Sequence, residues 1–169
     1  ETNQDISELV DKIVADPKTK IIFFNPALCD YEGYVLDGNV PTNSGKYEAR
    51  LQSREQRPEV NVKLLSGEKI ISKIRRKRKD IFLIGFKTTC GATSDEQYRA
   101  GLNLLKEASA NLVLANDTKT RLNMVITPEE ARYHETTNRS EALNGLVEMS
   151  LLRSHLTFTR STVVAGEPV

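Results

Sequence analysis

Polar side chains that could bind a nucleotide follow three short apolar runs of this chain. Short apolar runs separated by helix-length amphipathic segments are typical of buried parallel strands. In an open α/β sheet, ligands bind in the crevice outside the carboxyl ends of the strands. We therefore expect a nucleotide-sized site at one edge of a sheet. The three runs are Ile21–Phe24, Ile81–Ile84 and Leu112–Leu114.

The residue types at this predicted edge suit recognition of a ribose, a base or a phosphate. Asp30 supplies a carboxylate that could bind a ribose hydroxyl or a magnesium ion, although an Asp after a strand also favours a simple turn. Asn116 and Asp117 leave the same two interpretations open. Gly85 would let a ligand ring approach the main chain beside Phe86, but a strand glycine followed by a core phenylalanine is the commoner arrangement. The three positions together favour a binding site.

The chain lacks the nucleophile elbow of hydrolases, the P-loop and the histidine spacing of a zinc site. It has no Gly-x-Ser-x-Gly elbow, and the string Ser44-Gly45-Lys46-Tyr47 departs from the P-loop pattern at its last position. His134 and His155 lie far apart without the spacing of a zinc site. A lysine or arginine of the long polar segment at 31–58 could still close onto a polyphosphate.

The basic run Lys73–Lys79 suggests a nucleic-acid-binding module, which we keep as one hypothesis. The run closes a predicted helix, where cations stabilise the negative end of the helix dipole. Lysine and arginine number 24 against 23 aspartate and glutamate, a net charge of +1, whereas nucleic-acid binders show a basic excess. We therefore predict that this run is a solvated helix terminus.

The whole sequence predicts one α/β domain with a Rossmann-like, mostly parallel sheet flanked by helices. Its 169 residues, 38% hydrophobic and 28% charged, can build one core, and no run is long enough to span a membrane. Scattered glycines and prolines predict a long loop at 31–58 over the strand ends. Cys29 and Cys90 are too few for a disulfide scaffold and indicate thiols in a reducing cytoplasm. The predicted helices are 6–15, 67–79, 95–109, a segment starting at Thr127-Pro128, and 139–153; the predicted strands are 20–24, 59–65, 81–84, 111–115 and 124–126.

The order of these elements is similar to that of phosphopantothenoylcysteine synthetase, also called phosphopantothenate–cysteine ligase. The similarity runs from about residue 2 to residue 140 and is carried by Ala27–Tyr31, Gly85–Thr89 and the string Leu-Val-Leu-Ala-Asn-Asp at 112–117. The family's opening strands, with a Gly-Pro-Thr turn and a Ser-Asn-containing glycine loop, have no counterpart here. We therefore expect either the C-terminal part of a longer enzyme or a chain that has lost one step.

The resemblance implies a two-step ligation in coenzyme A biosynthesis. The carboxylate of 4'-phosphopantothenate attacks the α-phosphate of CTP or ATP, with magnesium on the triphosphate, and the amine of cysteine then displaces the nucleotide. It also implies a homodimer with no tightly bound cofactor. The balanced charge, the short apolar runs and the two cysteines separately predict a cytoplasmic protein with no nucleic-acid or membrane partner. The alternative is a non-catalytic nucleotide-binding relative that acts as a sensor or assembly subunit.

The resemblance assigns roles to particular residues as well. Arg50 falls in the register of the family's catalytic loop lysine, and because arginine presents its donors differently, Lys46 could take that role. Of two lysines that the family carries on the helix after Gly-Phe, only Lys106 lies near the expected place. The implied nucleotide-binding residues are Phe24, Asn25, Pro26, Asp30, Glu68, Lys69, Ile70, Ile71, Phe86, Lys106, Asn116 and Asp117, and no metal ligand is implied.

Overall fold

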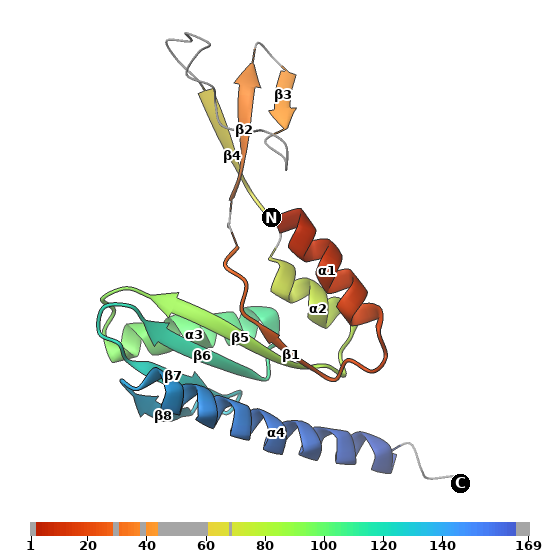
Figure 1. The fold of residues 1–169 in the computed structure, drawn as a ribbon, viewed down its shortest axis with the longest axis vertical. Coiled ribbons are helices and arrows are strands. Elements are labelled where there is room, and N and C mark those ends of the chain that lie inside the picture. Colours follow the sequence, from red (N-terminus) through yellow and green to blue (C-terminus); the bar gives the residue numbers. More distant parts are fainter. Residues whose placement is uncertain (1–2, 29–30, 38–39, 44–60, 68, 165–169) are drawn as a thin grey trace. The chain divides into compact units, whose positions relative to one another are not determined.

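The computed structural model describes residues 3–28, 31–37, 40–43, 61–67 and 69–164 (Figure 1). The chain divides into two compact units. We call residues 1–15 and 26–70 the ribbon unit, and residues 16–25 and 71–169 the sheet unit.

The described residues of the ribbon unit form one helix and three antiparallel strands. Helix α1 (Asn3–Ala15) buries Val10 and Val14 and ends just before Asp16-Pro17, as predicted. Strands β2 (Tyr31–Asp37), β3 (Val40–Asn43) and β4 (Asn61–Ser66) form a sheet in the order β3-β2-β4.

These strands differ from the predicted loop at 31–58. Residues 31–37 and 40–43 pair as an antiparallel ribbon, while 44–58 lie outside the described residues. Pro41 suggested a loop, but β3 is an edge strand, where a missing amide hydrogen leaves no central ladder bond unmade. Gly33 sits opposite Leu64 within the β2–β4 pairing.

The sheet unit is built on five strands in the order β1-β5-β6-β7-β8. Strands β1, β5 and β6 are parallel, β7 is antiparallel to β6, and β8 is antiparallel to β7, so four strands share one direction. This confirms the predicted open, Rossmann-like, mostly parallel sheet. The strands are β1 (Ile21–Phe24), β5 (Phe82–Thr89), β6 (Leu112–Asp117), β7 (Asn123–Ile126) and β8 (Arg132–Thr136).

Helices cover both faces of this sheet (Figure 1). They are α2 (Ile70–Lys77), α3 (Ser94–Ala108) and α4 (Arg139–Val164). On one face Gly101 of α3 packs so closely that an added Cβ would lie 2.4 Å from Ile126 Cδ1. The other face forms the core beneath α4, from Phe82, Ile84, Leu112, Leu114, Val125, Ala142 and Leu146. Among the described helices, none combines the length and apolar character that crossing a membrane requires.

Two strands and the last helix continue beyond the residues at which the sequence predicted that they end. Strand β5 continues through Gly85–Thr89, and β6 continues through Asn116 and Asp117, so these polar residues lie within strands. Helix α4 begins at the predicted residue and continues to Val164.

The predicted helix start at Thr127-Pro128 is a hairpin turn. The amide of Thr127 donates to the carbonyl of Ala131 at 3.2 Å, and Glu130 takes a left-handed φ of 59°. The turn leads into β8, whose exposed polar sequence gave no apolar signal. Tight hydrogen bonding across the turn therefore outweighs the local resemblance to a helix cap.

Candidate nucleotide site at the carboxyl edge of the sheet

A row of polar residues crosses four neighbouring strands of the sheet unit. Thr88 pairs with Asn116, Asn116 with Asn123, and Asn123 with Thr136. Because β5, β6 and β8 run in one direction, the row lies near the carboxyl ends of all three. This is the edge at which open α/β sheets bind ligands.

Asn116 and Asn123 are both buried, with 7% and 3% of their surface exposed. The Thr88 hydroxyl donates to Asn116 Oδ1 at 3.1 Å. Asn123 Nδ2 donates to the carbonyls of Arg121, at 2.7 Å, and Thr136, at 3.2 Å. These bonds fix the orientation of both amides, so the edge is preorganised.

The Asp117 carboxylate accepts hydrogen bonds from donors within the protein. Both oxygens accept hydrogen bonds, five in total at 2.8–3.0 Å, and these hold the pKa of the carboxyl well below its usual range, the Thr120 amide most strongly. The donors are the amides of Gly91, Ala92, Lys119 and Thr120 and the hydroxyl of Thr89.

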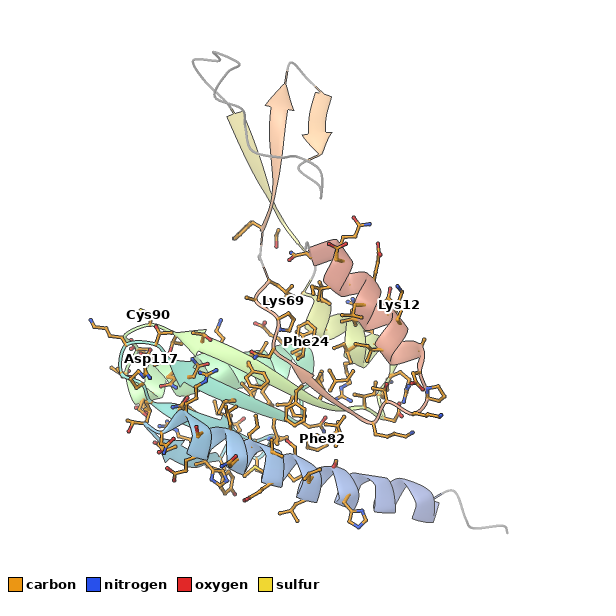
Figure 2. All side chains as sticks on the ribbon, viewed as in Figure 1. Lys12, Phe24, Lys69, Phe82, Cys90 and Asp117 are labelled. Carbon is orange, nitrogen blue, oxygen red and sulfur yellow. The ribbon has the colours of Figure 1, made fainter. Side chains whose placement is uncertain are left out.

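Asp117 therefore ties the loop after β5 to the turn after β6. Figure 2 shows Asp117 and Cys90 together at this end of the sheet, and the Cys90 thiol is free and exposed. A carboxylate with five internal donors does not suit a magnesium ligand. Among the described residues there is also no group of three or more His, Cys, Asp or Glu that could hold a metal.

A cavity of about 180 Å³ opens beside this edge. Its lining combines the end of β6, the β6–β7 turn, the start of β7 and the segment between β8 and α4. The lining residues are Asn116, Asp117, Thr118, Arg121, Asn123, Thr137 and Arg139. The cavity is thus polar and carries more positive than negative side chains.

Two of the other predicted site residues contribute to packing. Phe86 is partly buried against the core beneath α4. An added Cβ on Gly85 would lie 3.2 Å from Ile71 Cδ1 of α2 and 3.4 Å from Leu104 Cδ2 of α3. The absence of a side chain at Gly85 therefore leaves room for side chains of these two helices. The strand-core interpretation of Gly85-Phe86 is therefore the one that the packing favours. Phe24, at the end of β1, pairs with Gly85 in the same sheet and is followed by Asn25.

Lys106 lies away from this edge. It occupies the last turn of α3, and its ammonium binds Glu130 Oε1 at 2.7 Å. Helix α3 runs back from the carboxyl end of β5 to the amino end of β6. Lys106 and Asn116 therefore lie at opposite ends of the parallel strands.

The remaining predicted residues fall in two groups. Pro26, Lys69 and Ile70 belong to the ribbon unit. Asp30, Lys46, Arg50 and Glu68 lie outside the described residues.

The basic run is partly structural. Arg78 forms an ion pair with Asp80 at 2.7 Å, and the hydrogen bond from its guanidinium lowers the pKa of Asp80 to about 2. It also donates to the carbonyls of Asp16, at 3.1 Å, and Thr19, at 3.1 Å. Arg75 donates to four oxygens of neighbouring segments. These two arginines hold the end of α2, so they are not simply a solvated face.

Sequence reasoning missed Arg121, Asn123 and Arg139. Asn123 carried a usable signal, because a polar residue opening an apolar strand next to Asn116 falls at the same edge. Arg121 also carried a signal, because it lies between the two predicted strands 111–115 and 124–126. Arg139 carried none, because its place depends on the unpredicted strand β8.

No family model matches the chain, and no curated protein matches it. Solved structures do match. The DNA/pantothenate metabolism flavoprotein from Streptococcus pneumoniae has a TM-score of 0.67 and 19% identity, over 91% of this chain and 68% of that one. The C-terminal domain of the coenzyme A biosynthesis bifunctional protein CoaBC has a TM-score of 0.57 and 19% identity, over 92% of this chain and 64% of that one.

A mutant of Cab2 has a TM-score of 0.54 and 15% identity, over 83% of this chain and 45% of its own length. This chain thus spans about two thirds of the first two structures and less than half of the third. Identities at this level establish a shared fold. The chain therefore has the open α/β fold of proteins of pantothenate metabolism and coenzyme A biosynthesis, which confirms the resemblance drawn from its sequence.

Proposed function

We propose that this chain is the nucleotide-binding part of a ligase that joins 4'-phosphopantothenate to cysteine through an acyl-nucleotide intermediate. The polar row at the carboxyl edge carries this proposal, because Thr88, Asn116 and Asn123 are preorganised there. The edge belongs to a fold shared with a coenzyme A biosynthesis protein. Magnesium–CTP or magnesium–ATP is the co-substrate in this proposal.

The chemistry needs positioning and charge stabilisation more than a protein nucleophile. The pantothenate carboxylate attacks the α-phosphorus, pyrophosphate leaves, and the cysteine amine then forms the amide and releases the nucleotide monophosphate. Asn116 would orient the nucleotide, and Asp117 would hold the surrounding loops in place. Magnesium would arrive with the triphosphate, since Asp117 is already occupied by internal donors.

The proposal keeps Asp30 as a nucleotide contact and Lys46 or Arg50 as the loop cation on the phosphates. It also keeps a homodimer in the cytoplasm, which light scattering and cell fractionation would check. Lys106 is left out, because its ion pair with Glu130 places it at the opposite edge.

The test is a ligation assay with 4'-phosphopantothenate, cysteine and magnesium–CTP or magnesium–ATP. Mass spectrometry should detect phosphopantothenoylcysteine with one pyrophosphate released per amide formed. This chain spans about two thirds of the length of the first two matched structures, so turnover is expected from a polypeptide that also supplies the remaining third.

Nucleotide binding is measured separately on these 169 residues by thermal melting. A ligand at about 100 times its Kd stabilises by about 2.7 kcal/mol. Asp30→Ala should remove most of the nucleotide-induced shift, while Asp95→Ala, whose carboxylate pairs with Arg132 instead, should retain it. An unmoved melting curve at millimolar CTP and ATP would contradict the nucleotide site. Binding without turnover by the longer polypeptide would favour the sensor or assembly subunit.

A further inference from the structure

The cavity beside the polar row contains two arginines to which the proposed ligation assigns no role. Arg121 lies in the turn between β6 and β7, and Arg139 is the first residue of α4. Their side chains are exposed and line the same cavity as Asn116. They come from segments that the β7–β8 hairpin brings together.

Neither guanidinium has a carboxylate partner in the described part of the chain. By contrast, Arg78, Arg132 and Arg153 each bind a carboxylate at 2.6–2.9 Å. The lining does contain one acid, Asp117, but five internal hydrogen bonds already occupy its oxygens. The cavity is therefore cationic, with its charge available to a ligand.

Asn116 adds a neutral donor to the same cavity. Only 7% of its surface is exposed, and its Oδ1 accepts from the Thr88 hydroxyl. That bond leaves Nδ2 as the end of the amide with no acceptor among the described residues. Nδ2 is not among the described buried polar atoms that lack a partner, so solvent reaches this donor and a ligand oxygen can take the place of water there.

The amino terminus of α4 can attract an anion through the helix dipole, but two amides of its first turn are already hydrogen-bonded. Asn138 Oδ1 accepts from the amides of Ser140, at 3.0 Å, and Glu141, at 3.3 Å. A 26-residue helix still presents the positive end of its dipole toward this region. An anion here would be held by side chains.

We propose that this cavity binds the phosphate group of a phosphorylated ligand, held by Arg121 and Arg139 and by Asn116 Nδ2. Arginine forks match phosphate oxygens in geometry and charge. The volume of about 180 Å³ is below the roughly 300–1,000 Å³ of whole-ligand pockets, so the rest of the ligand extends outside. The inference rests on the proposed function through the shared Asn116. It adds that either phosphorylated substrate, the nucleotide or 4'-phosphopantothenate, could supply this phosphate.

The test compares binding of inorganic phosphate, CTP and 4'-phosphopantothenate by isothermal titration at constant ionic strength. The variants are Arg121→Gln, Arg139→Gln and the double variant. Lys119→Gln is the matched control, because it removes a cation from the same turn outside the cavity lining. Melting of each variant without ligand verifies the fold.

Each arginine variant should weaken the affinity for the probe whose phosphate occupies the cavity by about tenfold or more. The Lys119→Gln control should bind all three probes like the wild type. The probe with the larger loss identifies the source of the phosphate. Equal binding by wild type and double variant, or equal losses in the Lys119 control, would overturn the proposal. Phosphate binding that depends on both arginines in a protein without ligase turnover would keep the site and reject the proposed function. Ligase turnover by the wild type, together with unaltered affinity of the double variant for all three probes, would reject the phosphate site and keep the proposed function.

Discussion

Replacing Arg75 by methionine should destabilise the sheet unit, although the residue belongs to an apparently solvated basic run. Its guanidinium donates to the carbonyls of Ser109, Lys79 and Ile81 and to Asn111 Oδ1, at 2.6–3.0 Å. It therefore joins the end of α2 to the start of β5 and to the loop before β6. Partial burial desolvates the guanidinium and lowers the pKa of Arg75.

The magnitude follows from which of the four acceptors water can reach. The bonds to Ser109 and Lys79 are exposed, so water replaces them, whereas those to Ile81 and Asn111 are partly buried. Two charged hydrogen bonds at about 1.5 kcal/mol each give about 3 kcal/mol, and methionine avoids the desolvation cost of the charge. We expect a net loss of about 2 kcal/mol, or about 4–8 °C in Tm for a chain of this size.

The assay is urea and thermal unfolding of wild type, Arg75→Met, Arg75→Lys and Lys79→Met. Lysine keeps the charge but lacks the planar fork, so Arg75→Lys should lose an intermediate amount. The Lys79 side chain is exposed, and Lys79→Met should change the free energy of unfolding by less than about 0.5 kcal/mol. Equal losses in Arg75→Met and Lys79→Met would refute the reasoning, because the four bonds would then contribute nothing beyond general charge.

Three further changes test other parts of the sheet unit. Because folding lowers the pKa of Asp117, its carboxylate contributes to the free energy of unfolding above the unfolded pKa of about 4, and this contribution is lost as the pH falls. Asp117→Asn should therefore lower Tm at pH 7 and make Tm depend less on acid. An unchanged profile of Tm against pH would contradict this. Gly101→Ala places a methyl 2.4 Å from Ile126 Cδ1 and should cost about 1–3 kcal/mol in urea unfolding, with a loss below about 0.5 kcal/mol refuting the close packing. Gly145→Ala would meet the His134 ring at 2.5 Å, but that ring is exposed and can move, so calorimetry should give a smaller loss than for Gly101→Ala.

The central strands were predictable because burial makes their sequences continuously apolar. Their carboxyl ends were not, because the hydrogen-bond ladder continues into residues that look like a loop. Thr88 still pairs with Asn116, and Thr89 with Asp117, after the last apolar residue. Such endings depend on a neighbouring strand of matching length, which no local pattern reports.

The role of Asp117 illustrates a second limit. Its position after a strand predicted a ligand contact or a turn, and the structure makes it a tie between two loops. Two of its donors, the amides of Gly91 and Ala92, are about 25 residues away in sequence. An acidic residue in a sequence gives no indication of how many backbone donors will converge on it.

Arg139 was missed because of an error at the β7–β8 turn. Reading Thr127-Pro128 as a helix start removed β8 from the sheet and left Arg139 without a defined place. Once the hairpin is in place, β8 returns in the direction of β6, and the pairing of Asn123 with Thr136 brings the start of α4 to the carboxyl edge. The apolar parallel strands thus determine where a site can be, while the polar antiparallel hairpin determines which charges reach it.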